Sequence, residues 1–428
     1  MLRHTTFSIL LVTTALVAPH LAHADDPVFS YGEQGVSEGE FNGATGIDID
    51  GEGRVFITDR QRNRILHFET DGDFVAQSAF FFPGPPAISF DQIDDVAIGD
   101  NGRIYVANED DEQIVILDDD LDVISTFGSQ CVGPEVPGQG CADPDGAGPL
   151  EIGDGQFHGP SGIAYGLNNR IVVADTSNDR IQVFDEDGNF ILKFGIQGDG
   201  VGEFNIPAGV DVDNDGNIYV ADAGNDRIQV FDEDGNFIRA FGSSCSLEFG
   251  TGCEDPDDGG PLELGDGQFA AAADVIVDYA GTIYVVDPFN NRVQWFTNTG
   301  GFRGKLSLPE DTAAVRGIAI DAKGRLHVTT SNASGTPAGV PFIIGVYEID
   351  TDGDSFPDLW EQAGIDTDLD GEIEFDLTNA GTDYRGQTIT ADPNRKDIFV
   401  ELDYFDCTVA GHDCDPGDTH NHRPRDEA

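Results

Sequence analysis

The stretch 203–242 recurs in near copies along most of the chain, and this recurrence leaves few folds open. It reads as four short strands. Val210 and Val212 share a face of the first and Ile218 and Val220 share a face of the second, which is the two-residue alternation of a pleated strand. Its tight turns end in glycine, which readily takes the positive φ they need. A four-stranded meander cannot cover both of its faces alone. The repeat therefore predicts a closed ring of small sheets.

Six copies of the first strand can be read along the chain. They are GIDID from Gly46, DVAIG from Asp95, GIAYG from Gly162, GVDVD from Gly209, DVIVD from Asp274 and GIAID from Gly317. We therefore expect an all-β, six-bladed β-propeller over residues 25–350. The sixth copy lacks a fourth strand, whereas residues 27–41 match the fourth-strand junction at 190–204. We predict that residues 27–32 pair into blade six and close the ring.

The repeats follow the pattern "dG.iyVaD..N.RiqvF...G.f...fG" and resemble the NHL-repeat family of six-bladed β-propellers. The resemblance covers residues 27–350. It implies a binding platform, although a few relatives are enzymes and others bind RNA through a basic face.

An acidic and a basic residue recur at the junction of the second and third strands. In blade two both change together, to Asn108 and Gln113, as expected if the two side chains touch, because a lone buried charge is costly. We interpret the pairs as structural bridges that shape a loop, with a substrate-binding role as the alternative. The pairs are Asp59 with Arg64, Asp175 with Arg180, Asp222 with Arg227, and Asp287 with Arg292.

The composition is strongly acidic, with 80 Asp and Glu against 22 Lys and Arg and a formal net charge of −58. Such a charge repels nucleic acid phosphates and anionic lipids. We therefore expect no nucleic acid partner, and no stretch after the leader is long and apolar enough to predict a membrane span. High salt or bound divalent cations would screen the self-repulsion.

Residues 1–24 have the features of a signal peptide, with Arg3 before an apolar run and Ala22-His23-Ala24 at the cleavage site. We expect cleavage after Ala24 and a secreted, extracellular or periplasmic protein; an uncleaved anchor helix is the alternative. Six cysteines fit an oxidising compartment, with free or metal-bound thiols as the alternative. The local disulfides expected are Cys131–Cys141, Cys245–Cys253 and Cys407–Cys414.

Two similar insertions, within 129–157 and 243–269, each join the last strand of one blade to the first strand of the next. Both should project from one face of the ring, which makes that loop-bearing face a candidate recognition surface for an unknown protein, peptide or glycan. Their acidic residues either hold a hard cation through oxygen ligands or form a solvated loop. These residues are Asp143, Asp145 and Glu151, and Asp255, Asp257 and Glu263.

Beyond the propeller, residues 351–378 are rich in aspartate and resemble the EF-hand-like or thrombospondin type 3-like calcium loops of secreted bacterial proteins. The spacing of oxygen ligands predicts calcium, although Ser355 stands where the first loop usually has glycine and Leu377 ends the second. A disordered acidic linker is the alternative. The predicted ligands are Asp350, Asp352, Asp354, Phe356 through its carbonyl, Asp358 and Glu361, then Asp366, Asp368, Asp370, Glu374 and Asp376.

Residues 379–428 read as a partial C-terminal segment, and a zinc site at His412, His420 and His422 matches no closed motif. The function expected is a secreted, calcium-stabilised binding platform that is a monomer, with no catalytic residue predicted. One alternative is a metal-dependent propeller enzyme, a lyase or hydrolase, but His67, His158 and His327 stand at unmatched repeat positions. Another is the non-catalytic part of a larger metallopeptidase-like protein, or a structural spacer.

Overall fold

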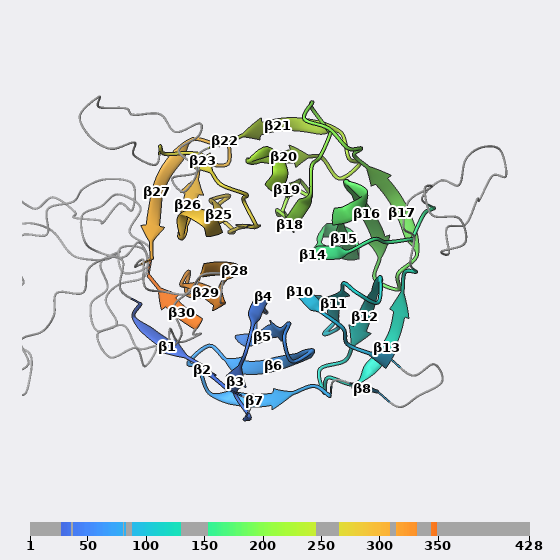
Figure 1. The fold of residues 1–428 in the computed structure, drawn as a ribbon, viewed down its shortest axis with the longest axis vertical. Helices are drawn as coiled ribbons and strands as arrows, with labels where there is room; N and C mark the ends of the chain where they lie inside the picture. The colour runs from blue at the N-terminus through green and yellow to red at the C-terminus, as the bar shows by residue number, and fades with distance from the viewer. Residues whose placement is uncertain are drawn as a thin grey trace, which may run out of the picture.

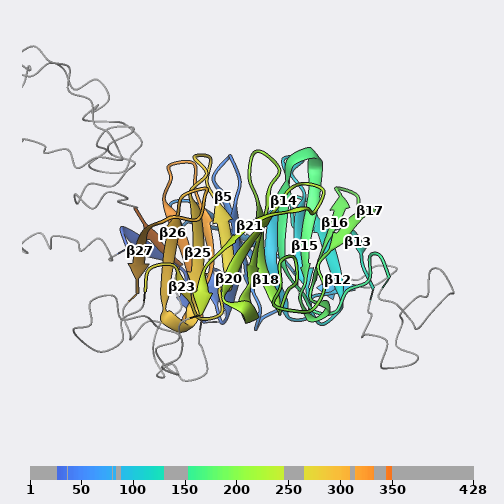
Figure 2. The same ribbon diagram turned by 90° about the horizontal axis from the view of Figure 1, so that it is seen from above.

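The computed structural model of this chain describes residues 27–35, 37–79, 81–82, 88–129, 153–244, 265–308, 314–331 and 344–348. These residues form six four-stranded antiparallel sheets arranged in a ring, as the repeats predicted (Figure 1). Seen from the side, the strands run roughly along the ring axis and the ring is a short cylinder (Figure 2). The signal peptide, all six cysteines and every predicted calcium ligand lie outside the described residues.

In each of the first three blades, the four strands follow one another along the chain. Blade one consists of β4 (Ala44–Ile49), β5 (Arg54–Asp59), β6 (Arg64–Glu69) and β7 (Phe74–Gln77). Blade two consists of β10 (Ile93–Ile98), β11 (Ile104–Asn108), β12 (Gln113–Leu117) and β13 (Val123–Phe127). Blade three consists of β14 (Pro160–Gly166), β15 (Arg170–Asp175), β16 (Arg180–Asp185) and β17 (Phe190–Phe194).

The remaining blades repeat this plan. Blade four consists of β18 (Pro207–Val212), β19 (Ile218–Asp222), β20 (Arg227–Phe231) and β21 (Phe237–Phe241). Blade five consists of β24 (Asp274–Val277), β25 (Ile283–Asp287), β26 (Arg292–Phe296) and β27 (Phe302–Ser307). Blade six consists of β28 (Ala314–Ile320), β29 (Leu326–Ser331), β30 (Ile344–Tyr347) and β1 (Phe29–Tyr31).

The predicted closure of the ring is confirmed. β1 pairs antiparallel with β30, with Phe29 opposite Val346 and Tyr31 opposite Ile344. The N-terminal strand therefore completes the sixth blade and covers an edge that β30 would otherwise expose.

Short elements occupy the connections. Two parallel pairs, β2 (Glu33–Gln34) with β3 (Glu40–Phe41) and β22 (Ser243–Ser244) with β23 (Gln268–Phe269), lie where one blade leads into the next. A further small pair is β8 (Phe81–Phe82) with β9 (Ile88–Ser89). The 3-10 helices are η1 (Leu167–Asn169), η2 (Thr176–Asn178), η3 (Ala223–Asn225) and η4 (Pro288–Asn290). Among the described residues, no helix is long and apolar enough to cross a membrane.

The hydrophobic core lies between the blades. One cluster joins Val172 and Ile181 of blade three to Val210, Val220 and Phe231 of blade four, all of them buried, and the other junctions repeat this arrangement. Burial of each large apolar side chain stabilises the fold by about 1.5–3 kcal/mol. Each blade thus covers a face of its neighbour, which is why no single repeat suffices.

Candidate functional site

The innermost strands β4, β10, β14, β18, β24 and β28 surround a central channel (Figure 1). We call the two ends the hairpin face, where tight turns join first and second strands, and the loop face, where one blade leads into the next. A cavity of about 490 Å³ opens at the hairpin face and one of about 230 Å³ at the loop face. Asp95 and Asp274 line both cavities, so they lie at the depth where the two meet.

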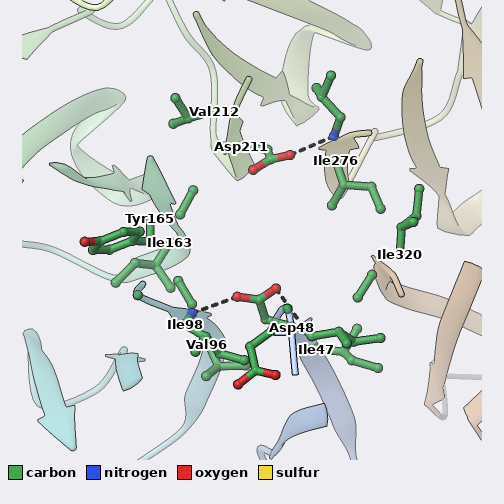
Figure 3. A pocket seen from close by; sticks show the side chains of 18 of the residues that line it. Ile47, Asp48, Val96, Ile98, Ile163, Tyr165, Asp211, Val212, Ile276 and Ile320 are labelled. Carbon is green, nitrogen blue, oxygen red and sulfur yellow. Dashed lines mark hydrogen bonds between the residues drawn. The ribbon is translucent and has the colours of Figure 1, made fainter. Parts of the chain in front are cut away.

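Asp48 of blade one and Asp211 of blade four lie on opposite sides of the larger cavity (Figure 3). Asp48 Oδ2 accepts a hydrogen bond of 2.7 Å from the backbone N–H of Ile98, in blade two. Asp211 Oδ2 accepts one of 2.7 Å from the N–H of Val277, in blade five. Each carboxylate therefore bridges to the next blade and is held in place by backbone.

Asp95 and Asp274 make the same kind of contact to the next blade, deeper in the channel than Asp48 and Asp211. Asp95 Oδ2 accepts from the N–H of Ile163 at 3.0 Å, and Asp274 Oδ2 accepts from the N–H of Ile318 at 3.1 Å. Blades one to three and four to six thus carry the same pattern of channel residues, which gives the channel an approximate two-fold symmetry.

The four carboxylates are hard to ionise. Burial raises the pKa of Asp48 to about 7 and that of Asp211 to about 8, and in Asp211 the charge of Asp48 adds to the rise. Burial also raises the pKa of Asp274 to about 7 and that of Asp95 well above its usual value, where the charge of Asp274 contributes. At neutral pH the cluster therefore holds protons or takes up positive charge from a ligand.

Glycine is required beside these carboxylates. A Cβ on Gly46 would lie 2.6 Å from Asp95 Cα, and one on Gly209 would lie 2.6 Å from Asp274 Cα. No Cβ fits at such distances, so glycine here lets neighbouring inner strands approach closely. The close approach brings each aspartate within reach of the next blade.

The hairpin-face mouth adds further charge and an aromatic ring. Asp50, Asp213 and Asp278 line it, together with Arg54, which pairs with Asp50 at 2.6 Å. The side chain of Tyr279 is 91% exposed at the same mouth. The charged groups of the wall are therefore mainly acidic from rim to floor and suit a cationic group of a ligand.

The loop-face cavity has a different character. Arg60 contacts Asp94 at 2.6 Å and also pairs with Glu109, and Arg316 lines the cavity beside Asp94. Burial lowers the pKa of Arg316, whereas Asp94 opposes that shift. Charges of both signs neutralise one another at this end of the channel.

The predicted Asp and Arg pairs are in contact in all four blades. The Nε to Oδ2 distances are 3.2 Å for Asp59–Arg64, 2.7 Å for Asp175–Arg180, 2.8 Å for Asp222–Arg227 and 2.9 Å for Asp287–Arg292. Each Asp also accepts the N–H of a residue that precedes its first strand, as Asp175 does from His158 at 2.8 Å. In blade two, Asn108 keeps this second contact, to the N–H of Asp91 at 2.7 Å. These contacts lie outside the residues that line the two cavities.

The histidines of the described blades do not line either cavity. His67 stacks on Phe56 with ring centroids 4.5 Å apart. His327 is fully buried, with Nδ1 3.0 Å from the hydroxyl of Tyr31 and Nε2 3.3 Å from Asp321 Oδ2. It therefore ties the closing strand to blade six.

No metal centre is formed within the described part of the chain, where no three His, Cys, Asp or Glu side chains are grouped to hold an ion. The acidic residues of both insertions and the loops from Asp350 onward are outside that part. The four channel aspartates were not among the site residues predicted from the sequence. A signal for them exists, since each stands in or at the start of an otherwise apolar first strand.

Comparisons with known proteins agree with the architecture. A family described as "6-bladed beta-propeller" matches residues 156–246. Protein brain tumor of Drosophila melanogaster is 50% identical over 48 residues, which are 11% of this chain and 5% of that protein. Protein lin-41 of Caenorhabditis elegans is 54% identical over 41 residues, 10% of this chain and 4% of that protein. The chain thus matches only a small part of these relatives.

Solved structures with a similar fold have low sequence identity. Virginiamycin B lyase from Staphylococcus aureus is 17% identical with a TM-score of 0.43, covering 72% of this chain and 85% of its own. Regucalcin from Agrobacterium tumefaciens, described as a calcium-binding protein, is 13% identical with a TM-score of 0.48, covering 74% and 95%. These likenesses concern the fold alone.

Proposed function

We propose that this chain, a six-bladed β-propeller of NHL-type repeats, is a binding module. Its hairpin-face cavity holds a cationic group of the ligand. The ligand class that fits is a peptide or protein segment presenting a Lys or Arg side chain.

One observation carries the proposal: aspartates from four blades converge on a single open cavity of about 490 Å³. Ligand cavities are typically about 300–1,000 Å³ and contain a few fixed polar groups. Asp48 and Asp211 are fixed by backbone hydrogen bonds, so little ordering is needed when a ligand binds. Burial raises the pKa of both carboxylates, and a ligand cation bound beside them would favour their ionised forms.

The charge of the whole chain supports the same ligand class. A net charge of −58 attracts cations from a distance and speeds their encounter with the protein at low ionic strength. Tyr279, exposed at the rim, offers a ring face for a cation–π contact with an arriving guanidinium or ammonium group.

Calorimetric titration with a tri-arginine peptide tests the proposal. We expect the protein to bind it, more weakly as salt rises. The Asp48→Asn/Asp211→Asn variant should bind at least about tenfold more weakly, since it lacks two carboxylates that can ionise beside the ligand. Asp234→Asn, on an exposed hairpin away from the channel, is the control and should bind like the original. Equal binding by all three proteins, or equal binding of tri-glutamate, would show that the cavity is not the site.

Calcium and export remain part of the proposal. The spacing of Asp350, Asp352, Asp354 and Glu361 supports a calcium loop after the propeller, and the leader at residues 1–24 supports secretion. Removal of calcium with a chelator should make the segment after residue 349 more sensitive to protease, because calcium stabilises only the folded loop. Limited proteolysis with and without calcium checks this, and an unchanged digestion pattern would count against calcium.

A further inference from the structure

We propose that the connection leading into blade four, residues 195–207, is a docking surface for a partner protein. The partner segment presents aliphatic side chains flanked by Lys or Arg. This surface is on the loop face, at the opposite end of the channel from the cavity proposed above. Each of the two proposals can therefore be tested independently of the other.

Three large aliphatic side chains on this connection are exposed to solvent. Ile196 is 66% exposed, Val201 is 69% exposed and Ile206 is 55% exposed. The backbone beneath them is anchored, because the N–H of Phe204 donates to the carbonyl of Ile196 at 2.8 Å and the Phe204 ring is fully buried against Phe231. Single exposed apolar residues are common on protein surfaces, but three within one short anchored connection favour an interaction site.

The other blades show that this apolar character is not required by the fold. At the position of Val201, the connections into blades three and five carry Asp154 and Asp266, which pair with Lys193 at 2.8 Å and Lys305 at 3.1 Å. In blade four both partners are apolar, since Ala240 stands at the strand position of the two lysines. A surface ion pair has thus been replaced on both sides by aliphatic side chains.

The connection into blade one also has non-aliphatic residues where the blade-four connection has exposed aliphatic ones. Residues 31–44 align with 194–207 without a gap, and the first connection carries Glu33, Glu38 and Gly43 where the blade-four connection carries Ile196, Val201 and Ile206. At these three positions the aliphatic side chains are thus particular to the blade-four connection, whereas the first connection carries Val36 where blade four has Asp199.

Ile206 is also held in a conformation that does not suit it. Its φ is +55°, a left-handed conformation that β-branched residues rarely adopt, and it precedes Pro207, which further restricts it. In blade three the equivalent residue before a proline is Gly159, with a φ of +63°. An exposed isoleucine is thus kept where glycine would be more stable. Blades two and five hold Gln92 and Ala271 at this position with φ of +50° and +54°, so the conformation belongs to the fold and only the β-branched side chain is particular to blade four.

Charge decides the kind of partner. Asp199 on the connection is exposed, whereas the exposed Asp154 and Asp266 on the neighbouring connections are already paired with lysines. A net charge of −58 opposes the approach of a second copy of this chain. A segment with aliphatic anchors and basic flanks fits both the exposed aliphatic side chains of this connection and the negative charge of the chain.

Selection from a phage-displayed library of random linear peptides, against the whole protein, tests the proposal. We expect selected peptides to combine Ile, Leu or Val with Lys or Arg. Val201→Asp, which copies blades three and five, should weaken their binding at least about tenfold. Ile206→Gly should weaken binding while the thermal midpoint stays the same or rises, which a purely structural role would not produce.

Two controls make the test specific. Val75→Asp changes an equally aliphatic residue, 48% exposed on β7 of blade one, and should leave binding unchanged. Asp234→Asn, on an exposed hairpin outside both proposed sites, should also leave it unchanged. The proposal is overturned if no peptide is selected, if Val201→Asp and Val75→Asp have equal effects, or if Val201→Asp instead abolishes a self-association of the chain seen by sedimentation.

Discussion

At the scale of single residues, one equivalent position in each first strand around the channel is occupied by either glycine or aspartate. The first strands carry glycine in four blades and aspartate in two, in the order Gly46, Asp95, Gly162, Gly209, Asp274 and Gly317. Glycine on one strand leaves room for the backbone and carboxylate of the next, as Gly209 does for Asp274. The aspartates therefore depend on glycines in a neighbouring blade.

Gly209→Ala should lower the free energy of unfolding by about 1–3 kcal/mol, because its Cβ would lie 2.6 Å from Asp274 Cα in a rigid strand. Gly51→Ala is the matched control, since nothing lies within 4 Å of its added Cβ. Urea unfolding followed by circular dichroism measures the difference. If the two variants unfold at the same urea concentration, the inner strands do not approach as closely as described.

At the scale of elements, the closing strand β1 is held by more than its ladder to β30. The Tyr31 hydroxyl contacts the buried His327 at 3.0 Å, and the Tyr31 ring lies 5.3 Å from that of Phe68, in blade one. The chain continues from β1 directly into blade one, whereas β1 and β30 are held together by non-covalent contacts, so β1 closes the ring within blade six.

Tyr31→Phe should lower the free energy of unfolding by about 1–3 kcal/mol, because Nδ1 of the buried His327 loses its partner. Ser30→Ala, an exposed position on the same strand, should change stability little. Thermal unfolding compares the two, and hydrogen exchange at Val346 reports on the β1–β30 ladder itself. Identical midpoints for the two variants would mean that the hydroxyl contact does not stabilise the closure.

The sequence predicted the elements better than the site. Strand alternation and glycine turns identified the blades, and the match between 27–41 and 190–204 identified the closure. Asp48 and Asp211 were missed because alternation places them opposite Ile47 and Val210, on a face that is ordinarily exposed to solvent. Only closure of the ring turns that face into the wall of a channel, so no single repeat contains the information.

At the scale of the whole molecule, the channel links stability to pH. The pKa values of Asp48 and Asp274 are about 7 and that of Asp211 about 8 in the folded protein, against about 3.9 for Asp in an unfolded chain. The folded protein therefore binds more protons than the unfolded chain across this window. Its stability should fall as pH rises from about 4 to about 8.

We expect the thermal midpoint to decrease from pH 5 to pH 8, and the slope to be smaller in Asp48→Asn/Asp211→Asn, because two titrating groups are absent. The variant also loses hydrogen bonds, so its midpoint at pH 5 should be lower than that of the original. Asp234→Asn should keep the original slope. A double variant with an unchanged slope would show that these carboxylates do not titrate in the window.

The position of β1 also determines how the ring responds to force. Phe29 lies opposite Val346, and the N–H of Val28 donates to the carbonyl of Val346 at 2.8 Å, so the chain joins and leaves the ring at the same end of one strand pair. Tension applied through the two flanking segments would load these bonds one after another, as in a zipper, rather than all together in shear. Blade six is therefore the mechanical weak point of the ring, and a tether pulling on both ends would open the ring there first.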